Sequence, residues 1–323
     1  MPVQQFLPLV GNDSVGQRTL HGTWLPPGSV VAAYVGPQSA VTDAYSSSGL
    51  LVSTLAAGLA RCRSGKGDYV VVLPGHTESV TTTTGLANLV AGTQIVGVAT
   101  FGSSLMPTFT FNGTTNTAVW TVSVNDVRMS GLRIECTGAD SMDTPIVWTG
   151  AGGSFDHNFV NLGSDTTHDC DVFLTVGTGA DNMQIVGNKF KSLSTAVNTN
   201  VVLVSGTAVE GVTIANNYMR TTLSSATGGV IAVTSAATNL DIYGNIMFNL
   251  VEDGVGIRIS DVACTGMIYD NYFGGVDAGG TVANALKAVS FAGTTNPVTK
   301  CFQNFATDEN AGSGVLSPAA ATT

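Results

Sequence analysis

One short phrase recurs through the second half of the chain: an apolar residue, two variable residues, Asn, one variable residue and a second apolar residue. It reads IVGNKF at residues 185–190, IANNYM at 214–219, IYGNIM at 242–247 and IYDNYF at 268–273. Weaker copies are FDHNFV at 155–160 and CFQNFA at 301–306. The asparagines are Asn158, Asn188, Asn217, Asn245, Asn271 and Asn304, so the steps between them are 30, 29, 28, 26 and 33 residues. Such a regular period indicates a structural repeat.

Between the copies lies a second apolar stretch that ends in a Gly or Ser/Thr turn, as in DVFLTVGTG at 171–179 and NVVLVSGT at 200–207. Each repeat therefore holds two or three short strands rich in β-branched residues and has no pattern for a helix. One such unit cannot bury its apolar side alone, but stacked units share a continuous core. We expect a solenoid of about eight coils between Tyr69 and Phe305.

The turn asparagines have a physical reason to recur. Asn tolerates the left-handed backbone conformation, and its amide can bond to the neighbouring turn. In stacked coils the amides can also pair from layer to layer. We therefore predict a structural turn ladder of Asn158, Asn188, Asn217, Asn245, Asn271 and Asn304, with a binding role as the alternative.

Upstream of the repeat, LLVSTLAAGLAR at 50–61 is typical of an amphipathic helix, and a Gly-rich turn then leads into a strand over 69–73. Together with the repeat, this order resembles right-handed parallel β-helix proteins, the group that includes pectate-lyase-like enzymes and phage tailspikes. The resemblance implies an all-β, right-handed parallel β-helix whose end is capped by the short helix. The expected division is an N-terminal arm over 1–44, the capping helix and Gly-rich turn over 45–68, the β-helix over 69–306, and a flexible tail over 307–323.

Composition excludes several partners. The chain has 323 residues, of which only 11% are charged, and a net charge of -10, so it offers no positive field for nucleic acid. No apolar run reaches about 18 residues and no secretory leader opens the chain, so we expect neither a membrane span nor a signal peptide. The five cysteines are far apart and odd in number, which favours buried thiols in a reducing compartment.

The arm does not follow the repeat. It contains the apolar, Pro-rich pieces FLPLVG at 6–11 and HGTWLPPG at 21–28. We expect an interface with a partner or a neighbouring subunit, and the alternative is a structured cap on the chain's own solenoid. The residues predicted to make that interface are Phe6, Leu7, Leu9, Trp24 and Leu25.

Carboxylates that could serve glycoside hydrolysis are scattered through turn-rich segments of the sequence, where Asp is common because its side chain bonds to the backbone of turns. They are Asp140, Asp143, Asp165, Asp169, Asp171, Glu252, Asp253 and Asp277. Asp253 and Asp277 stand about one coil apart and are kept as the alternative catalytic pair. The basic residues of the repeat are interpreted as widely scattered: Lys189, Lys191, Arg220, Arg258 and Lys287. His157 and the segment 168–171 lack the spacing of a zinc site, so we expect no catalytic residue, metal or cofactor.

Two functions remain open, and both draw on the resemblance. The first is a non-enzymatic bacteriophage virion structural protein, a head decoration or cement protein that assembles in the bacterial cytoplasm. Its partners would be further copies of itself, as a homotrimer, and the major capsid protein or another virion protein. The alternative is a tailspike or adhesin that binds or cleaves host surface polysaccharide.

Overall fold

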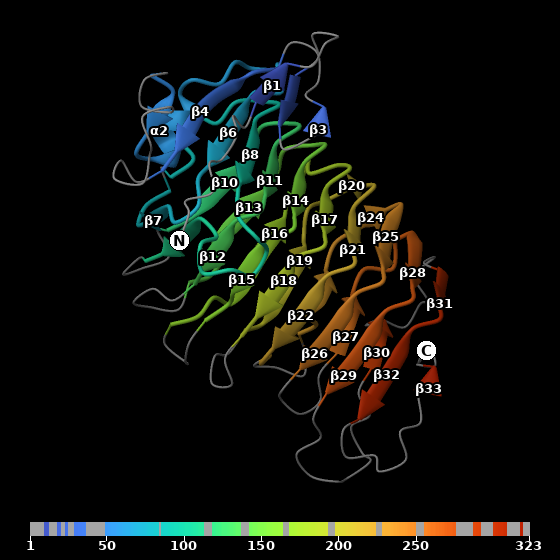
Figure 1. Ribbon diagram of the computed structural model, residues 1–323. Helices are drawn as coiled ribbons and strands as arrows, with labels where there is room; N and C mark the ends of the chain where they lie inside the picture. The colour runs from blue at the N-terminus through green and yellow to red at the C-terminus, as the bar shows by residue number, and fades with distance from the viewer. Residues whose placement is uncertain are drawn as a thin grey trace.

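The structure is a computed structural model of the chain. It describes residues 10–12, 18–20, 23–24, 29–36, 49–83, 85–112, 118–136, 142–163, 168–192, 198–223, 228–249, 255–275, 287–291, 300–308 and 317–318. Within these residues almost all regular structure is β-strand, and the strands stack in parallel into a β-helix (Figure 1). The fold is therefore the all-β parallel solenoid that the repeat predicts.

Three long sheets run along the solenoid, and we call them sheets I, II and III. Sheet I contains β5 (Leu51–Val52), β4 (Val31–Val35), β6 (Tyr69–Val72), β8 (Gln94–Gly97), β11 (Arg128–Ser130), β14 (Ser154–Asp156), β17 (Gln184–Val186), β21 (Thr213–Ala215), β25 (Leu240–Tyr243), β28 (Gly266–Tyr269) and β31 (Lys300–Phe302). Sheet II contains β7 (Thr77–Val80), β9 (Thr108–Phe111), β12 (Arg133–Glu135), β15 (Phe159–Asn161), β18 (Lys189–Lys191), β22 (Tyr218–Thr221), β26 (Ile246–Asn249), β29 (Tyr272–Gly275), β32 (Phe305–Asp308) and the antiparallel β33 (Ser317–Pro318). Sheet III contains β10 (Trp120–Val122), β13 (Ile146–Trp148), β16 (Val172–Val176), β19 (Asn200–Val204), β23 (Ile231–Val233), β27 (Val255–Ile259) and β30 (Lys287–Phe291).

Each coil visits the sheets in the order I, II, III. Six regular coils follow one another from β11 to β30, and a longer coil, β8 to β10, precedes them. The number is slightly below the expected eight because the first and last parts of the solenoid, β6–β7 and β31–β32, contribute strands to sheets I and II only. A small parallel pair, β20 (Val209–Glu210) and β24 (Ala237–Thr238), reinforces the corner between sheets III and I.

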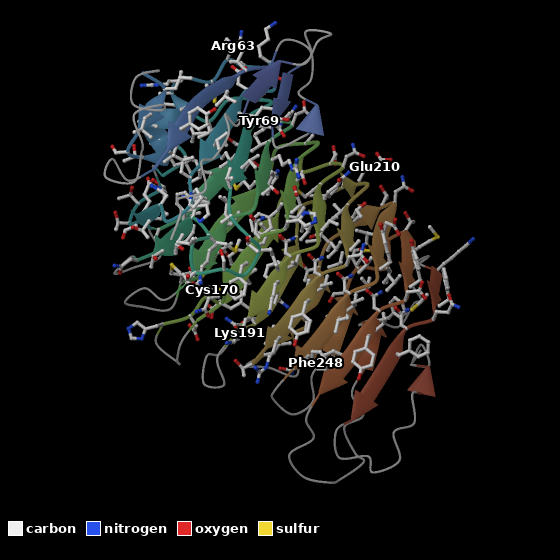
Figure 2. All side chains as sticks on the ribbon, in the orientation of Figure 1. Arg63, Tyr69, Cys170, Lys191, Glu210 and Phe248 are labelled. Carbon is white, nitrogen blue, oxygen red and sulfur yellow. The ribbon has the colours of Figure 1, made fainter. Side chains whose placement is uncertain are left out.

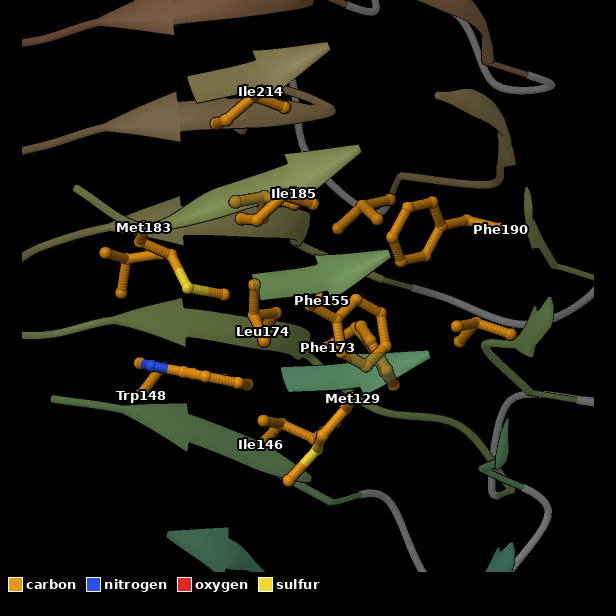
Figure 3. Packing of buried hydrophobic residues seen from close by; sticks show 14 of the residues in the cluster. Met129, Ile146, Trp148, Phe155, Phe173, Leu174, Met183, Ile185, Phe190 and Ile214 are labelled. Atoms are coloured by element: carbon orange, nitrogen blue, oxygen red, sulfur yellow. The ribbon is translucent and has the colours of Figure 1, made fainter. Parts of the chain in front are cut away.

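The core forms because side chains alternate in and out along every strand. In the three-residue strands of sheets I and II from β11 to β21 the central residue points inward and is fully buried, as Ile185 is in β17 and Phe190 in β18. Aromatic rings pack against one another across the core: the Phe173 ring lies 5.9 Å from that of Phe155 and 5.6 Å from that of Phe190 (Figure 3). Trp148 is buried in the same core.

The expected helix over 50–61 is wrong in its length. The observed helix, α2 (Leu55–Leu59), has five residues, and residues 51–52 form β5 instead. The cause is the free edge of β4, whose Tyr34 and Gly36 N–H groups donate to the carbonyls of Leu50 and Val52. The helix still closes the core, because Leu55 and Leu59 pack in the main apolar cluster at the N-terminal end of the stack (Figure 1).

Part of the arm belongs to the solenoid. β4 lies between β5 and β6 in sheet I, and its Ala33 and Val35 side chains are fully buried. For residues 31–35 the structure therefore favours the alternative interpretation, a segment packed on its own solenoid. The preceding β1 (Val10–Asn12), β2 (Arg18–Leu20) and β3 (Thr23–Trp24) form a separate small antiparallel sheet.

The predicted interface residues Phe6, Leu7, Leu9 and Leu25 lie outside the described residues, and only the backbone of Trp24 is described. The tail is described only at 307–308 and 317–318, so the proposed segment boundaries stay predictions. Within the described part of the chain, no helix has the length and apolar character needed to cross a membrane.

Candidate functional site

The turn asparagines form one column of amides at the corner between sheets I and II. The Oδ1 of Asn217 accepts bonds from the backbone N of Asn188 at 2.9 Å and from its Nδ2 at 3.0 Å. The Nδ2 of Asn217 in turn donates to the carbonyl of Ile185 at 2.8 Å and to the Oδ1 of Asn245 at 3.0 Å. Each amide thus joins three successive coils. The buried members are Asn158, Asn188, Asn217, Asn245, Asn271 and Asn304.

The left-handed residue of each turn is not the asparagine, as we expected, but the residue before it. His157 and Asn216 have φ values of 54°, and Gly187 has a φ of 67°. This geometry turns the chain between sheets I and II one step earlier, so the asparagine side chain points into the stack. The buried amides of the column bond to one another and to the neighbouring turns, as the predicted structural ladder requires.

A second cluster, on the outer side of sheet I, surrounds Asp156. Arg128 donates from Nε and Nη2 to the two carboxylate oxygens at 2.8 and 2.7 Å. Ser130, Ser154 and the ring of His157 complete its bonds at 2.8, 2.7 and 3.0 Å. Burial alone would raise the pKa of Asp156, but the hydrogen bonds from Arg128, Ser154 and His157 outweigh it and lower the pKa to about 2. This carboxylate is an ionised anchor for two coils, since its partners come from β11 and β14.

The cluster predicts a pH dependence of stability. Because the folded pKa of Asp156 is about 2 and the ordinary value is 3.8, its contribution is present above about pH 4 and is lost as the pH falls through 2. A shift of this size corresponds to about 2 kcal/mol. We expect Asp156→Asn to lower the free energy of unfolding by about that amount at pH 7 and by little at pH 2, measured by denaturant unfolding.

The matched control for this pH series is Asp270→Asn, because Asp270 is exposed and its left-handed conformation suits Asn equally well. Its stability should follow that of the wild type across the series. An Asp156→Asn curve parallel to the wild type from pH 7 to pH 2 would contradict the anchoring role.

The predicted carboxylate pair cannot be placed. Asp253 and Asp277 lie outside the described residues, as do Asp140, Asp165 and Glu252. Of the remaining candidates, Asp169 is buried, and burial together with the charges of Asp143 and Asp169 raises the pKa of Asp171. Among the described residues no group of three His, Cys, Asp or Glu side chains is arranged to hold a metal ion.

The cysteines are all free thiols. Cys136, Cys170 and Cys264 are buried, and Cys62 and Cys301 are half-buried. Burial raises the pKa of Cys62 to about 11 and that of Cys170 well above its ordinary value, so both side chains are protonated at neutral pH. These thiols serve as small packing groups and are poor nucleophiles.

The outer side of sheet II carries charged and aromatic side chains that point away from the core, and we call it the sheet II face. Strand register aligns Lys189 with Tyr218 and Lys191 with Arg220 on neighbouring strands. Large side chains continue along the two columns: Arg133, Phe159, Lys189, Tyr218, Ile246 and Tyr272 in the first, and Glu135, Asn161, Lys191, Arg220 and Phe248 in the second. Tyr218 and Ile246 are 37% and 44% exposed.

Contacts on this face mix charge and aromatic surface. The ammonium of Lys189 lies 5.7 Å from the ring centroid of Phe159 and 5.8 Å from that of Tyr218. The guanidinium of Arg133 covers the other side of Phe159 at 5.1 Å. Four cations and one anion, Glu135, project from these columns in a chain whose net charge is -10. The sheet II face is therefore a basic and aromatic stripe on an acidic protein.

The interpretation of the basic residues as widely scattered is wrong for Lys189, Lys191 and Arg220, which lie on two adjacent strands. The signal was present in the repeat: the first and third residues after each turn asparagine point outward on sheet II. The cluster becomes visible only when the coils are aligned by strand register, because residues 29 positions apart then lie about 4.8 Å from each other.

Comparison with known proteins found no family model, no curated protein and no solved structure that matches this chain.

Proposed function

We propose that this chain is a non-enzymatic structural protein of a bacteriophage virion, a head decoration or cement protein that works as a homo-oligomer bound to the capsid. The phage origin comes from the resemblance of the repeat, and the structural role comes from the molecule's surfaces. A solenoid held by a buried amide ladder is a rigid scaffold whose outer faces stay flat over several coils.

The observation that carries the proposal is the sheet II face. Its aromatic and cationic side chains stand in register over six strands, from β12 to β29. Tyr, Phe and Arg are the residue types enriched at protein interfaces. Such a stripe suits contact with another protein along these six coils of the solenoid.

Antibody labelling of purified phage particles tests this function. Gold-labelled antibody against the chain should decorate the heads of particles grown in the host that makes it. The predicted arm contact is tested in the same particles with Phe6→Asp and Leu9→Asp together, which should reduce the copies per particle at least about tenfold if the arm docks on the capsid. Unlabelled particles would contradict a virion role.

The second candidate, a tailspike or adhesin for host polysaccharide, is favoured by a row of stacked rings on sheet I. Tyr243 and Tyr269 stack at 5.1 Å between centroids and 8° between planes, and Tyr269 and Phe302 at 5.1 Å and 5°. Phe302 is exposed and the two tyrosines are half-buried, and outward-facing rings of this kind can carry sugar rings. Gold label at the tail, together with loss of polysaccharide cleavage in Asp253→Asn or Asp277→Asn, would make this candidate the better one.

A further inference from the structure

A second charged surface runs along the corner between sheets III and I, and we call it the acidic ridge. Its members are Asp181, in the turn before β17, and Glu210, in β20 just before β21. Glu210 is exposed and Asp181 is half-buried. The Oδ1 of Asp181 accepts a bond from the backbone N of Glu210 at 2.9 Å, so neighbouring turns of the ridge are joined.

The acidic ridge and the sheet II face lie on different sides of the solenoid. Figure 2 shows Glu210 at one long edge of the molecule and Lys191 and Phe248 toward the other. Among the described residues, no ion pair joins Lys189, Lys191 or Arg220 to an acid of the same chain, and none joins Asp181 or Glu210 to a base. Each surface therefore has charges available to a partner.

The charges of the two surfaces occur on the same coils. The β17–β18 coil carries Asp181 on the ridge and Lys189 and Lys191 on the face, and the β21–β22 coil carries Glu210 and Arg220. The β14–β15 coil, which precedes these two, is uncharged on both surfaces, with Ala151 on the ridge and neutral side chains at the two outward positions of β15.

The β11–β12 coil adds no match, because its ridge position is the neutral Asn125 and its Arg133 is ion-paired with Glu135 on the same face. Sliding one surface along the other by a single coil in either direction leaves only one of the two charged coils opposite an opposite charge. The charges therefore match best with no translation between the two surfaces.

We propose that the sheet II face of one copy docks on the acidic ridge of the next copy. Each coil then contacts the corresponding coil of its neighbour, and the copies are arranged around an axis parallel to the solenoid. A heterologous contact without translation along the axis closes into a ring when the rotation between copies is a whole fraction of a full turn, whereas a shifted contact builds an open filament. This inference rests on the proposed assembly function and identifies the partner as a second copy of this chain. The ring is the geometry that a trimer requires.

Charge reversal tests the contact by analytical ultracentrifugation of the full chain. Lys191→Glu with Arg220→Glu sets acid against acid, so self-association should weaken by about 100-fold. Asp181→Lys with Glu210→Lys sets base against base and should have the same effect. All four substitutions in one chain exchange the two signs and should restore the oligomer.

The control is Lys66→Glu with Lys300→Glu, which changes the net charge equally at exposed residues outside both surfaces and should leave the oligomer intact. Circular dichroism checks that every variant keeps its β-structure. An oligomer that survives Lys191→Glu with Arg220→Glu would overturn this contact while leaving the assembly function standing.

A monomeric wild type at every concentration tested would also overturn the contact, and the particle labelling would then decide the proposed function separately. Titration with alginate, a polyuronate, tests whether the sheet II face binds an acidic polysaccharide and not a second copy of the chain. Binding of alginate by a monomeric wild type, lost in Lys191→Glu with Arg220→Glu, would assign the sheet II face to an acidic polysaccharide instead.

Discussion

Replacing Asn217 by Leu should lower the free energy of unfolding by at least about 3 kcal/mol. The substitution removes the acceptor of two buried donors, the backbone N and the Nδ2 of Asn188, and the donor of the Ile185 carbonyl. Each buried polar group left without a partner costs about 1 to 3 kcal/mol. Leu has the same number of side-chain heavy atoms as Asn and the same branching at Cγ, so the substitution opens no cavity and the loss reflects the hydrogen bonds. Denaturant unfolding followed by circular dichroism measures it.

The ladder supplies its own control at its first member. The Oδ1 of Asn158 accepts a single bond, from the backbone N of Leu132, because the preceding coil has Leu132 at the ladder position. Asn158→Leu moves the start of the ladder by one coil and leaves one buried donor fewer unpaired than Asn217→Leu. We expect it to be milder by about 1 to 3 kcal/mol. Equal stability of both variants would contradict the account of the column as cooperating amides.

Phe173→Ala should have an effect of similar size, with an expected loss of about 3 to 5 kcal/mol. Phe173 is fully buried and lies between the rings of Phe155 and Phe190, which come from the neighbouring sheets I and II. Its removal leaves a cavity that three sheets cannot close, because the amide ladder and the strand register fix their separation. Thermal and denaturant unfolding should both report the loss.

Phe302→Ala is the matched variant, since the same side chain is removed from a surface stack. The Phe302 ring lies on Tyr269 with its side chain 46% exposed, so its truncation opens no cavity. We expect a loss below about 1 kcal/mol. A loss at Phe302 as large as that at Phe173 would mean that the outer rings, and not the core, hold the coils together.

The fold and the core follow from the local pattern of the sequence. A period of 26 to 33 residues, two or three short apolar strands per period and a recurring asparagine are consistent only with stacked coils, and alternation within each strand identifies the buried residues. Ile185, Phe190 and Trp148 could be assigned to the core in this way. Burial of one side of each strand is a local requirement, so the sequence carries it in every repeat.

Other features depend on neighbours that are distant in sequence. Residues 51–52 belong to a sequence stretch that is typical of a helix, but they pair with the edge strand β4 and become part of sheet I. The helix is therefore only five residues long. The left-handed conformation falls on His157, Asn216 and their equivalents because the amide of the next residue must reach the adjacent coil.

The arrangement of charges on the sheet II face and the acidic ridge was the feature that the sequence revealed least. Lys191 and Arg220 are 29 residues apart along the chain, yet register places them on adjacent strands of sheet II. Asp181 and Lys191 are close in sequence, yet the turn between sheets I and II carries them to different surfaces. The sequence by itself determined a stacked solenoid and its buried core, because burial recurs within each repeat. Only the tertiary structure decided which surface charges face the same way, because that depends on the register between coils.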